Sequence, residues 1–379
     1  MLKIVLLLLV SFDSYAGGMV FFCQPQQVAS MQSSLAGYFA TLGIPPDEIV
    51  HSSNDGVLRY TLNTPTSDFT TLDFSARPEL TIQDIRITLP ARNGGHHHLT
   101  TVSQKEIVLA LLQHGRWTEF KAEACDIKAL KDHVGVRQNI VAWAQELNWI
   151  WPNGGEAKWN KKYWRDGTPE KKYPLYVALN DVFMNQRHYA IGCYTAAKLV
   201  VMQGVLDYYR RIKQSPQQAQ RIEERLLLDQ EPLVGIEPAR LWAFEKDFDA
   251  STLNQPGKLL KIIDDVKPMN FVPGDWVYFL NTDTLSYEKI GYEGSNAIYL
   301  GRGQFSDYYN DHHHAYSYFE KLNEVYQWRN GVFSLSRDFL KIKPVQDAAR
   351  LGLPPSEGGL LNSVRVVPYY FSFGALPVR

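Results

Sequence analysis

The sequence predicts an α+β fold in which a helix that carries a single cysteine packs against a later antiparallel sheet. After Cys193, apolar and small residues recur at helical spacing, at Ala196, Ala197, Val200, Val201, Gly204, Val205 and Tyr208. β-Forming runs follow much later, at 275–279 after a Pro-Gly pair and at 296–300 before Gly-Arg-Gly. A helical stretch and further β-forming runs before residue 100 predict an additional small N-terminal α+β module.

Cys193 lies in the first turn of the helix that this spacing predicts. Unpaired N–H groups and the positive end of the helix dipole at that position favour the thiolate, which is the nucleophilic form of cysteine. Free cysteines are also common in protein cores, so the local pattern alone leaves a buried structural residue as an equal alternative.

The composition indicates a soluble globular protein. The chain has 379 residues, of which 45% are hydrophobic and 21% are charged, enough to bury a sizeable core in one large or two smaller domains. Its net charge of -1 gives no reason to expect a nucleic acid or an anionic membrane as partner.

The N-terminal segment has the pattern of a secretory signal peptide. Lys3 precedes an apolar run over 4–10, and Ser14 and Ala16 are small residues before a plausible cleavage site. The run is too short for a transmembrane helix, which needs about 20 apolar residues. We expect cleavage after about Ala16, which predicts a secreted or periplasmic protein without a membrane span; a buried first strand is the alternative.

Export gives meaning to the three cysteines, because an oxidising compartment pairs thiols and one of the three must be left over. A Cys23–Cys125 disulfide would tie the mature N-terminus to a later helix and leave Cys193 free. The sequence allows all three pairings, so this one is a hypothesis.

The other helices and strands are expected from periodicity and from helix signals. Ser103 and Glu106 form a capping-box pattern, so a helix begins at Ser103 and stops by Gly115. A helix over 126–147 is expected to break near Gly135. Further helices are expected over 24–42, 174–185 and 217–229, and further strands over 56–62, 67–74 and 80–90.

A cysteine nucleophile needs a base, and the candidates lie after Cys193. They are Glu293 and the run His312, His313 and His314, which Asp311 precedes directly. In an extended segment only alternate histidines face one side, so at most two of the three could serve the site. The alternatives are a surface loop of histidines and a zinc site. Such a zinc site would be built from His96, His98, His312 and His314.

The stretch from about 139 to 343 resembles the bacterial protein-glutamine gamma-glutamyltransferase (transglutaminase) family. The matching segments occur in order: NIVAWAQEL at 139–147, KYWRDGTPE at 162–170, YAIGCYTA around Cys193, PGDWVYFLN at 273–281, YEGSNAIYLG at 292–301, FEKLNEV at 319–325 and FSLSRDF at 333–339. The region before about residue 100 has no recognised counterpart. Together with the N-terminal pattern and the early β-forming runs, the resemblance predicts a signal peptide (1–16), a small module (17–100) and a transglutaminase-like catalytic domain (101–379).

The resemblance implies a papain-like fold that uses no metal or cofactor. In this family a cysteine, here Cys193, attacks a glutamine side-chain amide of a protein substrate. Ammonia leaves, and a lysine amine resolves the thioester into an isopeptide. Water as the second acceptor would give deamidation.

The chain departs from the family at both acidic neighbours of the cysteine. Ser295 stands where the family has its catalytic Glu, and Gly192 stands where the family has Glu directly before the cysteine. Glu293 lies two residues before Ser295 and could be brought in by a bulge. A histidine is the favoured replacement because it can act as base and then as acid, with His314 first and His312 next.

Two other functions stay open at this stage. One is a papain-like cell-wall peptidase or amidase, although such enzymes usually carry His where this chain has Ser295. The other is a catalytically inactive binding protein that kept the fold after losing its base.

Overall fold

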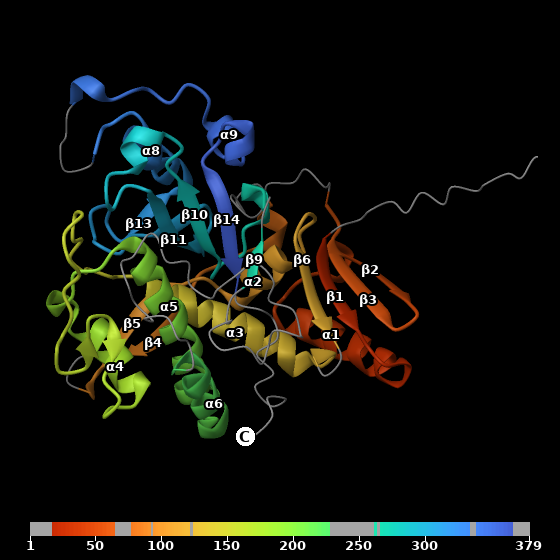
Figure 1. Cartoon of the computed structure of the whole chain (residues 1–379). Helices are drawn as coiled ribbons and strands as arrows, with labels where there is room; N and C mark the ends of the chain where they lie inside the picture. The colour runs from red at the N-terminus through yellow and green to blue at the C-terminus, as the bar shows by residue number, and fades with distance from the viewer. Residues whose placement is uncertain are drawn as a thin grey trace, which may run out of the picture.

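The computed structural model describes residues 17–64, 77–91, 94–121, 124–227, 261–263, 266–333 and 339–366 (Figure 1). Helices and antiparallel strands both build it, as the predicted α+β class requires. The predicted signal peptide and the predicted strand over 67–74 lie outside the described residues.

A four-stranded sheet in the order β2-β3-β1-β6 forms one side of the molecule. β1 (Gly18–Phe22) pairs antiparallel with β3 (Val57–Leu62), which in turn pairs with β2 (Ile49–Asn54). The fourth strand, β6 (Trp117–Lys121), runs parallel to β1 although it comes from beyond residue 100. α1 (Val28–Thr41) packs on this sheet, with the rings of Phe39 and Tyr60 in edge contact. The division of the chain at about residue 100 stays a prediction.

Cys23 and Cys125 form the disulfide that was proposed from the sequence, with Cα atoms 5.3 Å apart. The bond joins the end of β1 to the segment just before α3 (Ile127–Ala144) across a sequence separation of 102. Cys193 is the free cysteine of the chain. The pairing hypothesis is therefore confirmed.

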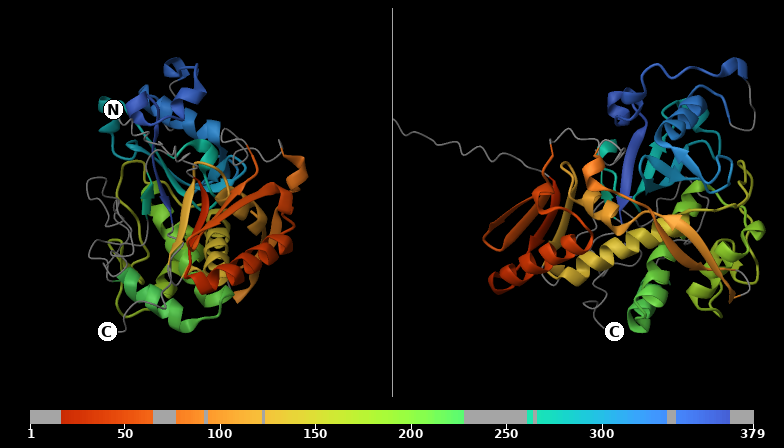
Figure 2. Two further views of the ribbon diagram at one scale, coloured as in Figure 1. Left: turned by 90° about the vertical axis from the view of Figure 1, so that its right-hand side faces the viewer. Right: turned by 180° about the vertical axis from the view of Figure 1, so that it is seen from behind.

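Two long helices, α3 and α5 (Cys193–Asp207), pack against each other in the centre of the fold (Figure 2). A Cβ atom on Gly204 would lie 2.5 Å from Cγ1 of Ile140, and one on Gly135 would lie 2.4 Å from Cε2 of Tyr208. The expected break at Gly135 is wrong, because α3 is continuous and this glycine lets the Tyr208 ring approach the helix.

The other predicted helices are present with small changes of boundary. α2 (Gln104–Leu111) begins after Ser103, whose Oγ accepts a hydrogen bond from the Glu106 N–H at 3.2 Å. The helices predicted over 174–185 and 217–229 are α4 (Leu175–Met184) and α6 (Pro216–Leu227). Among the helices that the structure describes, none combines the length and apolar character needed to cross a bilayer.

A six-stranded antiparallel sheet in the order β13-β12-β11-β10-β14-β9 forms the other side. Its strands are β9 (Lys261–Ile263), β10 (Trp276–Leu280), β11 (Gly294–Gly301), β12 (Gln304–Ser306), β13 (Ala315–Ser317) and β14 (Leu361–Val366). α5 contacts β11, and α8 (Tyr318–Arg329) follows β13 directly and contacts β10, β11 and β12. The N-terminus of α5 is thereby brought to the middle of this sheet.

The entry to β10 is held by a fully buried group of charges, which we call the sealed cluster. Asp275 accepts two hydrogen bonds from the Arg116 guanidinium and one from Arg137, all at 2.8 Å. It accepts a fourth from the Val272 N–H at 2.9 Å. Burial alone would raise the pKa of Asp275, but the two guanidiniums hold it below its usual value.

The remaining elements are short. β4 (Ile85–Pro90) and β5 (His96–Thr101) form a hairpin, and β7 (Trp164–Arg165) pairs with β8 (Thr168–Pro169). α7 (Thr284–Tyr287) lies between β10 and β11 in the chain, and α9 (Ala348–Leu351) precedes β14.

Candidate active site

Cys193 is the first residue of α5, as the sequence predicts, and Gly192 is its N-cap. The segment before it is extended and bridges to Ile150 and Lys158 through Ala190, which fixes the direction in which the helix starts. The first turn of α5 contains no acidic residue. The helix dipole therefore acts on the sulfur without an adjacent carboxylate on the same helix.

β11 brings hydrogen-bond donors to the sulfur. The Asn296 N–H lies 3.4 Å from Sγ and the Asn296 Nδ2 lies 3.7 Å from it, while the thiol faces the Gly294 carbonyl at 3.7 Å. Residues two apart on a strand face the same side, so Gly294 and Asn296 both reach Cys193. The Trp276 indole N–H donates to Asn296 Oδ1 at 2.8 Å, which fixes the orientation of the amide.

The electrostatic surroundings of the thiol act in both directions. Burial raises the pKa of Cys193, whereas the two hydrogen bonds from Asn296 and the charge of Lys321 lower it. The charge of Glu324 raises it again, and the net direction is upward.

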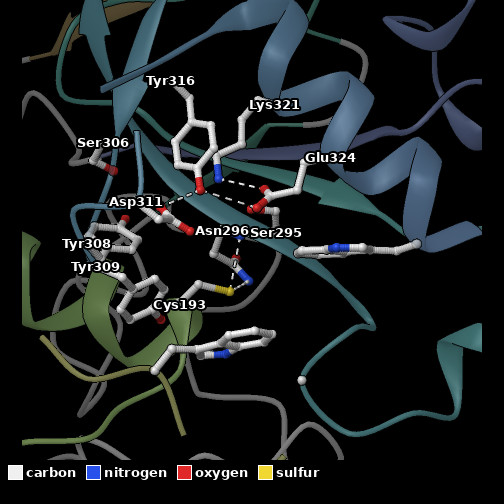
Figure 3. A pocket seen from close by; sticks show the side chains of 13 residues that line it. Cys193, Ser295, Asn296, Ser306, Tyr308, Tyr309, Asp311, Tyr316, Lys321 and Glu324 are labelled. Atoms are coloured by element: carbon white, nitrogen blue, oxygen red, sulfur yellow. Dashed lines mark hydrogen bonds and ion pairs between the residues drawn. The ribbon is translucent and has the colours of Figure 1, made fainter. Parts of the chain in front are cut away.

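Cys193 lines a pocket whose opposite wall carries the polar side chains of Asp311, Tyr316, Lys321 and Glu324 (Figure 3). The lining residues are Trp151, Cys193, Gly291, Ser295, Asn296, Ser306, Tyr308, Tyr309, Asp311, Tyr316, Lys321, Glu324 and Trp328. They come from α5, the strands β11 to β13 with their connections, α8 and the loop after α3. The pocket thus lies between the N-terminus of α5 and the six-stranded sheet with α8.

The wall opposite Cys193 holds a group of polar side chains, which we call the pocket cluster: Asp311, Tyr316, Lys321 and Glu324. The Tyr316 hydroxyl lies 2.7 Å from Asp311 Oδ1 and 3.3 Å from Glu324 Oε1. Lys321 Nζ donates to Glu324 Oε2 at 2.8 Å and lies 3.6 Å from the centre of the Tyr316 ring. Burial and the two carboxylates raise the pKa of Tyr316, so its hydroxyl stays protonated.

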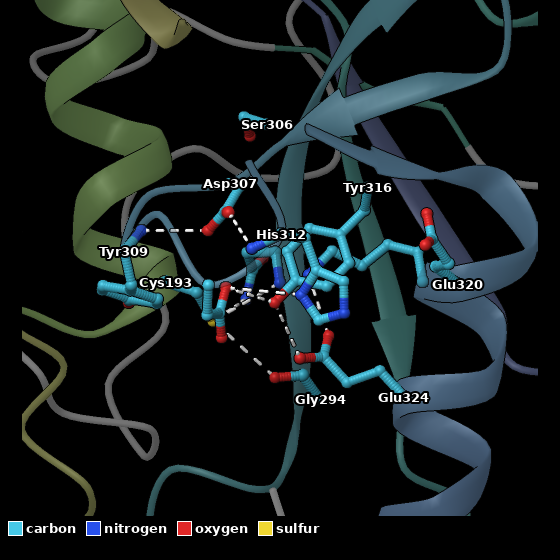
Figure 4. A network of polar contacts seen from close by, with 12 residues as sticks. Cys193, Gly294, Ser306, Asp307, Tyr309, His312, Tyr316, Glu320 and Glu324 are labelled. Carbon is cyan, nitrogen blue, oxygen red and sulfur yellow. Dashed lines mark hydrogen bonds and ion pairs between the residues drawn. The ribbon is translucent and has the colours of Figure 1, made fainter. Parts of the chain in front are cut away.

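The loop over 307–314 supports this wall (Figure 4). The buried Asp307 carboxylate accepts hydrogen bonds from the backbone N–H groups of Tyr309 at 3.1 Å and His312 at 2.6 Å. Burial and a hydrogen bond with Asp311 raise the pKa of Asp307. The Tyr309 hydroxyl donates to the Ile191 carbonyl at 3.0 Å and so ties the loop to the segment before Cys193.

The three histidines lie in this loop, and none of them is among the residues that line the pocket. His313 and His314 have φ angles of 52° and 72°, so the run is a turn and not an extended segment. His312 lies against the Tyr316 ring at 4.1 Å with Nδ1 at 3.6 Å from Asp311, and its side chain is 43% exposed. The choice of a histidine as base stays a prediction.

Glu293 also points elsewhere, although Ser295 does line the pocket. The Glu293 carboxylate accepts the Gly291 N–H at 2.9 and 3.0 Å. The β10–β11 register is regular from Gly294 to Ile298, so the bulge that would bring Glu293 to the thiol is not present.

No group of three or more His, Cys, Asp or Glu side chains is placed to hold a metal within the described ranges. His96 and His98 belong to β5, where His98 Nδ1 lies 2.9 Å from the Thr88 hydroxyl of the paired strand.

Sequence reasoning missed Asn296, Tyr316, Lys321 and Glu324 as site residues. A signal for Lys321 was present, since it falls among the buried positions Tyr318, Leu322 and Val325 of one helix face. A lysine on an apolar stripe needs a buried partner, and Glu324, one turn on, supplies it.

The chain is similar to known proteins in its sequence. A family model described as "Protein-glutamine gamma-glutamyltransferase" matches residues 85–331. The protein-glutamine gamma-glutamyltransferase of Bacillus pumilus (strain SAFR-032) is 27% identical over 213 residues, which make up 53% of this chain and 72% of that protein. Among solved structures, the transglutaminase from Geobacillus stearothermophilus (without C-terminal extension) matches with 17% identity and a TM-score of 0.43, covering 67% of this chain and 100% of that chain.

Proposed function

Because the chain belongs to the protein-glutamine gamma-glutamyltransferase family, we propose that it transfers the acyl group of a protein glutamine through a thioester on Cys193. The acceptor is an amine such as a lysine side chain. The observation that carries the proposal is the position of Cys193, a free thiol at the N-terminus of α5 that opens into a pocket beside the donors of Asn296.

The reaction has two halves. The Cys193 thiolate attacks the carbon of the glutamine amide, the C–N bond breaks, and ammonia leaves after taking a proton from an acid in the pocket. The amine then attacks the thioester carbon, the C–S bond breaks, and the amine loses a proton to the same group. Water in place of the amine gives glutamate. Neither half needs a cofactor.

Two features of the site stabilise the thiolate and so offset part of the effect of burial, which keeps the net shift of the Cys193 pKa upward. The N–H and the side-chain amide of Asn296 point at Sγ, and the first turn of α5 adds its dipole. The aromatic side chains of Trp151 and Trp328 give the pocket apolar walls that would take the methylene groups of a glutamine or lysine side chain.

We further propose that the domain over 101–379 is papain-like and acts outside the cytoplasm, after removal of residues 1–16. The Cys23–Cys125 disulfide supports this location, because such bonds persist in oxidising compartments. The module over 17–100 would position the enzyme on its target.

Incorporation of a labelled primary amine into a glutamine-rich protein tests the proposal. Wild-type protein is expected to incorporate the label and release ammonia, and Cys193→Ala is expected to do neither. Activity that survives this substitution would refute Cys193 as nucleophile. Ammonia release without incorporation would identify a deamidase, whereas release of soluble muropeptides from cell walls would identify the peptidase alternative. A protein that does none of these would be a binding protein.

A further inference from the structure

We propose that Glu324 is the proton acceptor and donor for Cys193, and that Tyr316 and Lys321 are positioning residues that hold its carboxylate. This assignment rests on the proposed function. It gives the chain a carboxylate from α8 in place of the one that Ser295 and Gly192 do not supply.

The first support is location. Glu324 and Cys193 line the same pocket, whereas Glu293 and the three histidines do not. Glu324 lies within the helical body of α8, which the Ser317–Glu320 capping box starts, so its backbone is fixed independently of the loop over 307–314. A carboxylate on a helix is a more exact support for catalysis than one on a loop.

The second support is that Glu324 has an oxygen available for a proton. Lys321 Nζ occupies Oε2 at 2.8 Å, so Oε1 is the remaining acceptor. The Tyr316 hydroxyl has a single proton, and it is directed to Asp311 at 2.7 Å rather than to Glu324 Oε1 at 3.3 Å. Glu324 Oε1 is therefore the weakly engaged carboxylate oxygen of the pocket cluster.

Asp311 is less suited to the role although it also lines the pocket. Its carboxylate accepts the Tyr316 proton and a hydrogen bond from Asp307, which lower its pKa against the effect of burial. Its side chain is 50% exposed, against 16% for Glu324. A carboxylate that is already satisfied and open to water is a weak base.

The third support is electrostatic. The negative charge of Glu324 acts on the Cys193 thiol and raises its pKa, while Lys321 acts in the opposite direction. Both charges therefore act on the thiol, and the pocket that Glu324 and Cys193 share is where the proposed proton exchange takes place.

The proton moves as follows. It leaves Cys193 Sγ for Glu324 Oε1, and the thiolate forms the S–C bond to the glutamine amide. The protonated carboxyl group then gives the proton to the amide nitrogen, the C–N bond breaks, and ammonia departs. In the second half Glu324 takes a proton from the attacking amine and returns it to the sulfur as the C–S bond breaks.

The test is Glu324→Gln with two readouts, because they are expected to move in opposite directions. Transamidation kcat/KM should fall about 10²- to 10³-fold, since general acid–base catalysis is lost. Alkylation of Cys193 by iodoacetamide at neutral pH should rise about two- to tenfold, since removing the negative charge lowers the thiol pKa. A glutamine keeps an oxygen for Lys321, so the fold is retained.

Matched variants complete the design. Glu288→Gln removes an exposed carboxylate from the end of α7 and is expected to change neither readout. His312→Asn and His314→Asn are expected to keep activity within about threefold, far from the loss of a catalytic acid–base group. A 10²-fold loss in either histidine variant, with Glu324→Gln unaffected, would overturn the assignment in favour of histidine.

The outcomes separate the two levels of inference. Wild-type protein without any amide chemistry would end the proposed function. Active wild-type protein with a fully active Glu324→Gln variant would end only the role of Glu324. A variant in which turnover and alkylation fall together would show that Glu324 supports the structure rather than the proton transfer.

Discussion

The sealed cluster and the pocket cluster contain the same kinds of side chain in opposite arrangements. In the sealed cluster one carboxylate lies between two guanidiniums, with side-chain exposures of 0% for Asp275, 2% for Arg116 and 1% for Arg137. In the pocket cluster Asp311 accepts the shorter hydrogen bond from the Tyr316 hydroxyl and Glu324 accepts one from Lys321, with side-chain exposures of 6% for Lys321 and 16% for Glu324.

The difference separates a structural group of charges from a reactive one. Each carboxylate oxygen of Asp275 accepts two hydrogen bonds, so no lone pair is left for an incoming proton. Glu324 keeps an oxygen that no strong donor engages, and it lines the same pocket as the Cys193 thiol. Saturated hydrogen bonding stabilises a fold, whereas incomplete hydrogen bonding beside a nucleophile allows chemistry.

The largest expected effect is on stability, from Asp275→Asn. The substitution leaves two buried guanidiniums without a counterion, so the free energy of unfolding should fall by about 3–5 kcal/mol. Urea unfolding followed by tryptophan fluorescence measures this change. Asp283→Asn is the control, because asparagine keeps the N-cap of α7 and should cost less than about 0.5 kcal/mol. Equal unfolding midpoints for the two variants would show that the sealed cluster is not structural.

Glu106 shares one property with each cluster. It is buried like Asp275, but its ion-pair partner Arg302 is part-exposed. Burial raises the pKa of Glu106 to about 7, and Arg302 compensates only in part. Because the folded-state pKa exceeds the unfolded one, the stabilising contribution is complete below about pH 4.5 and is lost as pH rises through about 7. As pH rises through this range, ionisation of Glu106 is expected to lower the free energy of unfolding by about 3 kcal/mol. Glu106→Gln should remove the slope in urea midpoint against pH, and an unchanged slope would assign it to other groups.

The comparison also shows what sequence could and could not provide. Local signals predicted that a helix starts at Ser103 and that Cys193 begins another, because capping and periodicity depend on neighbouring residues. The contact between Cys193 and Asn296 depends on the register of β11 against a helix about a hundred residues earlier, which no local pattern specifies. The left-handed backbone at His313 and His314 could not be predicted from the sequence either, since histidine does not favour that conformation as glycine does.

Asn296→Asp tests the side of the pocket that carries the sulfur. Aspartate keeps the acceptor for the Trp276 indole but replaces the amide donor by a negative charge near Sγ. The thiolate is then disfavoured, so kcat/KM should fall about 10- to 100-fold and iodoacetamide should react more slowly. Asn323→Asp adds the same charge on the exposed face of α8 and should leave both rates near wild type. Faster alkylation in Asn296→Asp would contradict the donor role of the amide.

Lys321→Met gives the smallest expected effect and the sharpest contrast with the sealed cluster. Methionine fills similar space against the Tyr316 ring but removes the positive charge that lowers the pKa of Cys193. The alkylation rate at neutral pH should fall about two- to tenfold, opposite in sign to Glu324→Gln. Lys289→Met, which removes an exposed ammonium from the faces of Tyr292 and Phe333, is the matched control and should leave the rate unchanged. If the alkylation rate falls in Lys321→Met and rises in Glu324→Gln, both charges act on the thiol. A shared sign would mean that the pocket cluster, like the sealed cluster, contributes only to the stability of the fold.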